Sequence, residues 1–250
     1  MVTALVLSGG TGTRMGVETP KQYIEVEKRP IIAYCLKTLF SHNGIDAVQI
    51  VADEMWRDTI LSSMEQIRDD GREAAIPKKT ISEKAAGAIS KFKGFSRPGR
   101  NRQMSILHGL EDIREYAGDA DYVLIHDAAR PLLSEELITD CLQAAAGHDG
   151  VLPALPMKDT VYFSENGKKI ASLLDRGRIF AGQAPELFLL GKYYEANRAL
   201  LPERILQING STEPAVMAGM DIVMIPGDEG NFKITTKADL IRFQERVGTA

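Results

Sequence analysis

The sequence predicts an α/β fold in which a mostly parallel sheet is covered by helices on both faces. Short apolar runs that suit buried strands alternate along the chain with longer segments whose apolar residues recur at helical spacing. Such alternation is typical of parallel sheets, because their crossover connections carry helices. The chain has 250 residues, of which 44% are hydrophobic, enough for a substantial core in one domain or at most two.

The expected elements follow from the local pattern. In residues 30–41, for example, Ile32, Cys35 and Leu39 lie on one face of a helix. Ser134 suits the N-cap of the helix that follows it. The expected strands are 4–7, 47–52, 122–126, 151–155 and 221–225, and the expected helices are 30–41, 55–67, 101–117, 135–146, 191–200 and 237–247.

Two stretches interrupt this pattern. Residues 69–98 are rich in Lys, Gly and Ala and close with Arg-Pro-Gly, so we expect a mobile insertion with a short helix near residues 82–92. Residues 160–174 contain Asn-Gly at 166–167 between two strand-like runs, the strongest short signal for a β-hairpin. A long hairpin on an α/β core usually packs against another subunit or covers a site, so we expect a protruding arm at about 156–182.

The composition narrows the class of protein. The formal net charge is −4. Nucleic acid and membrane surfaces are therefore poor candidate partners, because proteins that bind them usually carry a dominant basic face. No apolar stretch is long enough for a membrane span, and no N-terminal segment is typical of a signal peptide. Cys35 and Cys141 are far apart and lie in expected helices, which favours reduced thiols and a cytoplasmic protein. The four histidines lack metal-ligand spacing.

The most informative segment is LVLSGGTGTRMGVETPKQY, residues 5–23. It leads from the first strand into a glycine-rich loop with little side-chain bulk. Small residues let backbone N–H groups approach a bound anion, and N–H groups at a helix N-terminus favour negative charge. Arg14 and Lys21 follow the loop and add two positive charges. We therefore expect a cradle for several phosphates.

Two familiar phosphate loops do not fit this segment. The P-loop needs Gly-Lys-Ser/Thr after four spacer residues, whereas Gly16 is followed by Val17 and Lys21 by Gln22. The dinucleotide fingerprint needs a third glycine where Met15 stands. A purely structural glycine turn is the alternative to a phosphate cradle.

Three further segments carry polar groups that suit a phosphate site. HDAARP at 126–131 follows an expected buried strand, where open α/β sheets bind ligands, although a structural ion pair is the alternative. GRNRQMS at 99–105 offers a glycine and a serine to a nucleobase edge, or is an ordinary helix start. NFKITT at 231–236 places Lys233 in an uncharged run, as a third cation near phosphates, with Thr236 as an N-cap.

Taken in order, these motifs resemble one family, the cytidylyltransferases that make CDP-activated polyols: the 2-C-methyl-D-erythritol 4-phosphate enzymes and their ribitol-5-phosphate relatives. The segments that carry the resemblance are GGTGTRMG and PKQY within 9–23, R-x-x-S at 102–105, HDAARP at 126–131, KDT at 158–160 and NFKITT at 231–236. The resemblance implies a single Rossmann-like nucleotidyltransferase domain over residues 1–250. It also implies transfer of CMP from CTP to a polyol phosphate with release of pyrophosphate.

The resemblance further implies roles for individual residues, with Mg²⁺ as cofactor and no protein ligand to the metal specified. The hairpin is similar to the family's dimerisation arm, so two of its residues would act in the partner's site of a homodimer. The expected catalytic residues are Arg14, Lys21, Arg176 and Lys233. The expected CTP-binding residues are Leu7, Ser8, Gly9, Gly10, Thr11, Gly12, Thr13, Gly99, Arg100, Ser105 and Asp127. Those expected to bind the polyol phosphate are Asp127, Arg130, Thr160, Arg176 and Lys233.

The chain departs from the family pattern near the expected acceptor site. QAPE at 183–186 stands where the family usually has Gln-Thr-Pro-Gln, so a threonine hydroxyl is absent, and STE at 211–213 replaces the usual Thr-Asp pair. We expect 2-C-methyl-D-erythritol 4-phosphate as acceptor, giving 4-diphosphocytidyl-2-C-methyl-D-erythritol for isoprenoid precursor synthesis, with ribitol 5-phosphate as the alternative. A nicotinamide-dependent dehydrogenase and a non-catalytic nucleotide-binding protein are the competing hypotheses. The enzyme hypothesis requires Arg14, Lys21 and Lys233 to converge.

Overall fold

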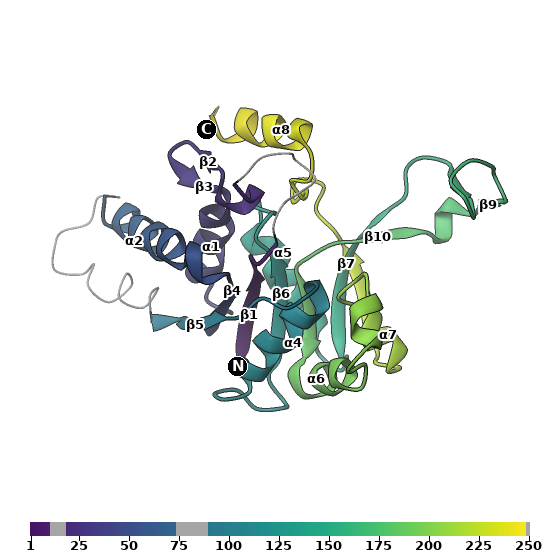
Figure 1. The fold of residues 1–250 in the computed structure, drawn as a ribbon, viewed down its shortest axis with the longest axis horizontal. Helices are drawn as coiled ribbons and strands as arrows, with labels where there is room; N and C mark the ends of the chain where they lie inside the picture. The colour runs from purple at the N-terminus through teal and green to yellow at the C-terminus, as the bar shows by residue number, and fades with distance from the viewer. Residues whose placement is uncertain (11–18, 74–89, 249–250) are drawn as a thin grey trace.

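An eight-stranded mixed sheet forms the centre of the fold (Figure 1). The computed structural model describes the chain apart from residues 11–18, 74–89 and 249–250. The strand order is β10-β7-β11-β6-β1-β4-β5, with β12 paired to β7. The strands are β1 (Val2–Leu7), β4 (Ala47–Val51), β5 (Phe92–Ser96), β6 (Tyr122–Asp127), β7 (Gly150–Pro156), β10 (Phe180–Gly182), β11 (Glu186–Leu189) and β12 (Ile222–Pro226).

The α/β fold with a mostly parallel sheet is confirmed. β1 runs parallel to β4 and β6, β4 parallel to β5, and β7 parallel to β12. β11 runs antiparallel to β6 and β7, and β10 antiparallel to β7. The sequence did not predict β10 and β11, because they span only three and four residues on either side of a proline-containing loop.

Helices cover both faces of the sheet. They are α1 (Ile31–Ser41), α2 (Arg57–Glu73), α4 (Arg102–Ile113), α5 (Glu135–Ala144), α6 (Leu190–Arg198), α7 (Glu213–Met217) and α8 (Lys237–Gly248). Successive β1 residues face opposite sides: Ala4 and Val6 pack with α1, α2 and α5, whereas Leu5 packs with α4, α6 and α7. None of the helices within the described residues is both long and apolar enough to cross a bilayer.

The predicted hairpin arm is present and projects from the sheet (Figure 1). Its strands β8 (Val161–Phe163) and β9 (Ser172–Leu174) pair antiparallel in a small sheet of their own. The Asn-Gly pair lies in the connecting loop rather than in a two-residue turn, where Asn166 Oδ1 accepts the backbone N–H groups of Lys168 and Lys169 at 2.9 and 3.2 Å. Gly167 has a φ of +68°, which glycine adopts at little cost.

Both ends of the expected insertion at 69–98 belong to the main fold. α2 extends to Glu73, and β5 adds to the sheet beside β4, so the expected helix does not reach residue 92. Lys93 and Gly94 obscured the strand pattern, but the rings of Phe92 and Phe95 pack edge to face with centroids 5.0 Å apart. Most of the expected short helix lies outside the described residues.

Smaller elements complete the fold. Two residue pairs form a short β-hairpin after the first 3₁₀ turn, and a second 3₁₀ turn leads into α2. These elements are η2 (Lys21–Tyr23), β2 (Glu25–Val26), β3 (Arg29–Pro30), η3 (Glu54–Trp56), η4 (Arg176–Arg178) and η5 (Arg204–Gln207).

α8 begins with a reciprocal cap. Asp239 N donates to Thr236 Oγ1 at 3.2 Å, and Asp239 Oδ2 accepts the backbone N–H groups of Thr235 and Thr236 at 2.9 and 2.8 Å. Thr236 is therefore the N-cap, as predicted. Because the buried Phe243 packs α8 against α1, the cap also fixes the chain that carries Lys233 just before it.

We predict that Asp239→Ala lowers the free energy of unfolding by about 1 kcal/mol at pH 7, because it removes the reciprocal cap. Burial alone would raise the pKa of Asp239, but hydrogen bonds from Thr235 and Thr236 lower it to about 2. This stabilisation is present above the unfolded pKa near 4 and is lost as the pH falls towards 2. Urea unfolding at pH 7 and pH 3 measures both effects. Glu65→Ala, at an exposed position on α2, serves as control and should change stability by less than about 0.5 kcal/mol.

Candidate functional site

The carboxyl ends of four neighbouring strands lie in register. Ser96 of β5 pairs with Val51 of β4, Val51 pairs with Leu7 of β1, and Leu7 pairs with Asp127 of β6. The glycine-rich, GRNRQMS and HDAARP motifs therefore emerge side by side. This edge is where open α/β sheets bind ligands.

The start of the glycine-rich loop is braced by the side chain that follows Lys21. Gln22 Nε2 donates to the carbonyl oxygens of Ser8 and Gly10 at 2.7 and 2.8 Å. Gln22 is buried, and Lys21 is half-buried at the start of η2. Lys21 therefore directly precedes the side chain that holds the start of the loop.

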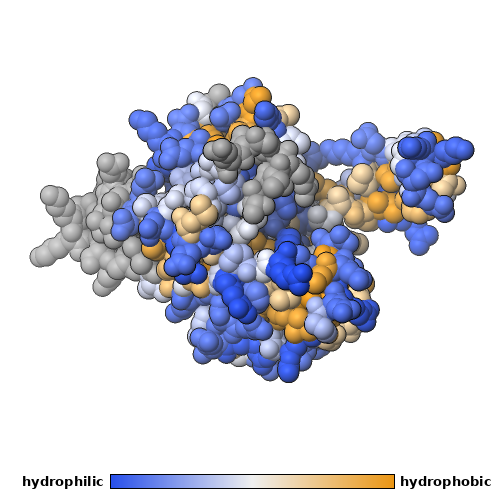
Figure 2. Space-filling model, viewed as in Figure 1, coloured by the Kyte–Doolittle hydropathy of each residue, from blue (hydrophilic) through white to orange (hydrophobic). Residues whose placement is uncertain are grey.

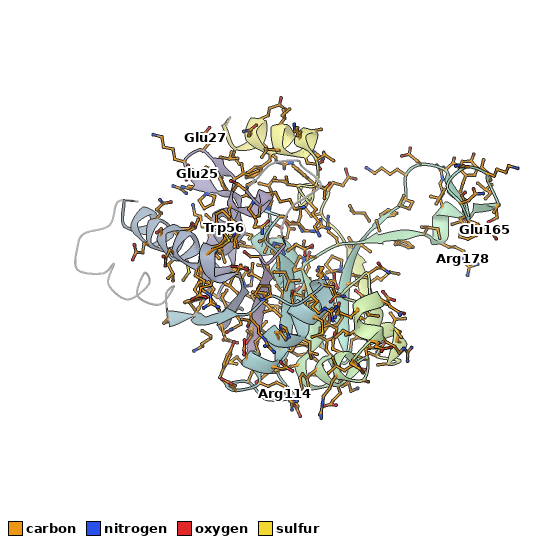
Figure 3. The ribbon with its side chains drawn as sticks, in the orientation of Figure 1. Glu25, Glu27, Trp56, Arg114, Glu165 and Arg178 are labelled. Carbon is orange, nitrogen blue, oxygen red and sulfur yellow. The ribbon has the colours of Figure 1, made fainter. Side chains whose placement is uncertain are left out.

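Tyr23 supports the same loop from the next position. Its hydroxyl donates to Ser8 O at 3.0 Å and also bonds to Ser8 Oγ, while its ring stacks on Trp56 with centroids 4.3 Å apart (Figure 3 labels Trp56). Burial raises the pKa of Tyr23, so its hydroxyl remains protonated at neutral pH. The loop is therefore held by two side chains of the PKQY motif.

Two glycines are required where the loop meets the turn before α4. A Cβ on Gly9 would lie 2.7 Å from Pro98 Cβ, and one on Gly99 would lie 2.6 Å from Ser105 N. Gly99 N donates to Ser105 Oγ at 2.9 Å, and that hydroxyl donates to a backbone carbonyl at 3.0 Å. The Ser105 hydroxyl is thus engaged within the turn, and Arg100 is exposed.

Asp127 is the centre of a largely buried ionic network. Arg102 donates Nε and Nη2 to Oδ1 at 3.1 and 3.0 Å, and Lys233 donates Nζ to Oδ2 at 2.8 Å. Arg130 Nε lies 3.8 Å from Oδ2. Burial alone would raise the pKa of Asp127, but these cations hold it well below its ordinary value. Three cations around one carboxylate leave a net positive cluster.

His126 fixes the turn that carries Asp127 and Arg130. Its Nε2 donates to Arg130 O at 3.0 Å, and Arg130 N donates to Asp127 O at 2.9 Å. Burial lowers the pKa of His126 to about 4, so the imidazole is neutral at neutral pH. His126 therefore stabilises the turn without adding charge to the site.

The loop that carries Lys233 is attached to the connection between β10 and β11. Asn231 Nδ2 donates to Ala184 O at 2.7 Å, and Gln183 Nε2 donates to Asn231 O at 3.3 Å. Arg130 Nη1 donates to the same Asn231 oxygen at 2.8 Å. The QAPE segment thus acts through backbone and amide groups to hold Lys233 near Asp127.

The structure does not bring every expected residue together. Thr160 and Arg176 lie on the exposed arm, where Arg176 Nη1 donates to Lys158 O at 2.8 Å. No contact in the described part of the single chain joins them to the Asp127 network. The expected site residues outside the described part are Thr11, Gly12, Thr13 and Arg14.

Sequence reasoning missed several residues of this site. Arg102 stands in the R-x-x-S motif, but its pairing with Asp127 required knowledge of the fold. Gln22 belongs to the PKQY motif, but a neutral amide gives no signal in the sequence that it binds the loop. Glu186 carries a buried carboxylate near the cations, and a single acidic residue in a short strand gave no signal of this.

The described residues contain no group of three or more acidic, His or Cys side chains arranged to hold a metal ion. Asp127 offers carboxylate oxygens at the site, and cations already engage both of them. A Mg²⁺ ion at this site would therefore depend on substrate phosphates and water for most of its ligands.

Comparison with known proteins gives a consistent family. The family model for IspD, 2-C-methyl-D-erythritol 4-phosphate cytidylyltransferase, matches residues 2–248. A ribitol-5-phosphate cytidylyltransferase from Streptococcus agalactiae serotype V is 29% identical over 98% of this chain and 94% of its own length. A 2-C-methyl-D-erythritol 4-phosphate cytidylyltransferase from Rubrobacter xylanophilus is 34% identical over 95% of this chain and 91% of its own length.

Solved structures agree on the fold. The 4-diphosphocytidyl-2C-methyl-D-erythritol synthase from Anaerococcus prevotii has a TM-score of 0.77 at 21% identity, covering 99% of this chain and 96% of its own. The family match spans nearly the whole chain, and the relatives named above are cytidylyltransferases, which are nucleotidyltransferases that use CTP. The dehydrogenase hypothesis is therefore excluded. The chain belongs to the IspD family and is a cytidylyltransferase.

Proposed function

We propose that this cytidylyltransferase transfers CMP from CTP to 2-C-methyl-D-erythritol 4-phosphate, giving 4-diphosphocytidyl-2-C-methyl-D-erythritol and pyrophosphate for isoprenoid precursor synthesis. The observation that carries the proposal is the cluster of Arg102, Arg130 and Lys233 around Asp127, in register with the start of the glycine-rich loop. Such a positive cluster beside such a loop suits two phosphorylated substrates. The Rubrobacter xylanophilus relative, at 34% identity, is named for this acceptor.

In the proposed reaction, an oxygen of the acceptor phosphate attacks the α-phosphorus of CTP in line. The bond from that phosphorus to the leaving pyrophosphate oxygen breaks. Because both reactants are anions, the enzyme must neutralise the repulsion between them and align them for attack. A strong general base is not required. The neutral, buried His126 and the ion-paired Asp127 agree with this requirement.

Different cations are proposed to bind the two substrates. We assign Arg14 and Lys21 to the triphosphate, since both belong to the segment that forms the glycine-rich loop. We assign Arg130 and Lys233 to the acceptor phosphate, with Asp127 orienting their heads. A Mg²⁺ ion bound with CTP would neutralise part of the triphosphate charge.

Ribitol 5-phosphate is the second candidate acceptor. The Streptococcus agalactiae relative, named for ribitol 5-phosphate, is 29% identical over 98% of this chain. Ala184 also lacks the side-chain hydroxyl that the family resemblance places near the acceptor phosphate. The cationic cluster would bind the phosphate of either polyol, so the carbon skeleton must be distinguished by other contacts.

A direct comparison of acceptors tests the proposal. Purified protein with CTP and Mg²⁺ is supplied with 2-C-methyl-D-erythritol 4-phosphate or with ribitol 5-phosphate, and pyrophosphate release is measured for each. We expect kcat/KM to be at least about tenfold higher for the methylerythritol compound, the scale of one favourable contact. Higher kcat/KM with ribitol 5-phosphate would reverse the acceptor assignment, and no release with either would point to another polyol phosphate as acceptor.

We predict that Lys21→Ala lowers kcat by on the order of 10²-fold or more, because it removes a preorganised charge beside the triphosphate. Steady-state kinetics with saturating CTP measure the effect. Lys37→Ala, which removes the same charge from an exposed position on α1, should leave kcat unchanged. A Lys21→Ala variant with the kcat of the unmodified enzyme would refute the role of Lys21.

We also propose that the arm joins two copies of the chain in a homodimer. Several of its large side chains are exposed in the single chain: Tyr162 (53%), Phe163 (50%), Ile170 (67%) and Leu173 (65%). Figure 2 shows hydrophobic atoms on the surface of the arm. Apolar surface of this kind commonly marks a protein interface. A partner's arm would then bring Thr160 and Arg176 to the site that lacks them within one chain.

Mixed dimers provide the test. If Arg176 acts in the partner's site, mixing inactive Lys21→Ala and Arg176→Ala chains creates heterodimers in which one site is complete. Random exchange should restore about one quarter of the original activity, since half of the dimers are mixed and each has one complete site. Activity after denaturation, mixing and refolding is the measurement, with each variant refolded alone as control. Absence of any gain would show that Arg176 does not act across the dimer.

We further propose a cytoplasmic location. Cys35 and Cys141 are buried and unpaired, and burial raises the pKa of both thiols to about 12. Such thiols behave as small core residues and fit a reducing compartment.

A further inference from the structure

Glu186 is a buried carboxylate that the proposed mechanism does not use. It is the first residue of β11 and pairs with Ile125 of β6, two residues before Asp127. Because side chains alternate along a strand, Glu186, Ile125 and Asp127 face the same side of the sheet. Diagonal neighbours in an antiparallel pair are about 7–8 Å apart, so the two carboxylates belong to one region.

The carboxylate of Glu186 is held by hydroxyl groups. Its Oε2 accepts hydrogen bonds from Ser211 Oγ at 2.5 Å and Thr212 Oγ1 at 2.8 Å, just before α7. The residue is only 8% exposed. These donors keep the carboxylate in place without neutralising its charge.

The negative charge of Glu186 acts electrostatically on Arg102 and Arg130. Burial alone would lower the pKa of both Arg102 and Arg130, and the carboxylates of Asp127 and Glu186 act in the opposite direction on each guanidinium. The net effect is a raised pKa for Arg102 and a lowered pKa for Arg130. Arg102, at the start of α4, is thus influenced by two carboxylates, of which only Asp127 forms a direct ion pair with it in the described structure. Arg130 has a buried Nε without a hydrogen-bond partner. Glu186 therefore acts on the cationic cluster from a distance.

We propose that Glu186 is a positioning residue that serves as a fixed counter-charge behind Arg102 and Arg130 and weakens their hold on phosphate groups. A site with several cations would bind substrates and pyrophosphate with similar strength, and such uniform binding does not raise kcat. The fixed negative charge lowers the attraction for all anions and allows pyrophosphate to leave. This inference rests on the proposed phosphate-binding role of the cationic cluster, which would also attract the leaving pyrophosphate.

Glu186→Gln tests the proposal, because the amide oxygen can still accept the two hydroxyl donors while the charge is lost. Binding of inorganic pyrophosphate is measured by calorimetry at constant Mg²⁺ and at two salt concentrations. We expect the Kd to fall by about threefold to tenfold and its salt dependence to steepen, as for one added net charge in a partly screened site. In turnover assays the inhibition constant of pyrophosphate should fall in parallel.

Glu195→Gln is the matched control. It makes the same substitution and the same change in net charge on α6, at an exposed residue that lies near Arg114 and Arg198. Its pyrophosphate Kd should equal that of the unmodified enzyme. An unchanged or raised Kd in a folded Glu186→Gln variant would overturn the proposal.

A second variant covers the case in which Glu186→Gln does not fold. Thr212→Lys places an ammonium group beside the same carboxylate from a half-buried position, and should also lower the pyrophosphate Kd. A folded Thr212→Lys variant that binds pyrophosphate no more tightly would count against the counter-charge. Because these binding measurements need no acceptor, they remain informative even if the proposed acceptor is wrong.

Discussion

The ionic network around Asp127 is the interaction on which the site depends. One carboxylate at the end of β6 receives Arg102 from the start of α4 and Lys233 from the loop before α8, with Arg130 close by. A buried carboxylate that loses its partners costs several kcal/mol. The same contacts therefore tie two distant segments to the sheet and gather the positive charge that two phosphorylated substrates require.

Neutral side chains provide most of the support around this network. Gln22 binds carbonyls of the glycine-rich loop, His126 binds the turn that carries Arg130, and Asn231 bridges the Lys233 loop to the β10–β11 connection. Each of them donates a hydrogen bond to at least one backbone carbonyl oxygen. These supporting side chains thus add no charge, and the electrostatic potential at the site is set by the arginines, lysines and carboxylates.

The sequence predicted the parts of this enzyme that depend on local pattern. Apolar runs located β1, β4 and β6, and the motifs that follow the first and last of these proved to lie side by side because parallel strands end at one edge. The edge strand β5 escaped prediction because Lys93 and Gly94 interrupt its apolar pattern, and β11 because it is short. Pairing of Arg102 with Asp127 depends on tertiary structure, and any role of Arg176 in the site depends on a second chain.

Gln22 has a consequence for the first encounter with the nucleotide. A single amide nitrogen donates to the carbonyl oxygens of both Ser8 and Gly10, so a donor partly offsets two partial negative charges next to the proposed triphosphate site. This stretch of backbone is already ordered before any ligand arrives, and less conformational entropy remains to be lost on association. In the proposed binding of the triphosphate, an uncharged side chain behind this loop would thus contribute to its preference for anions.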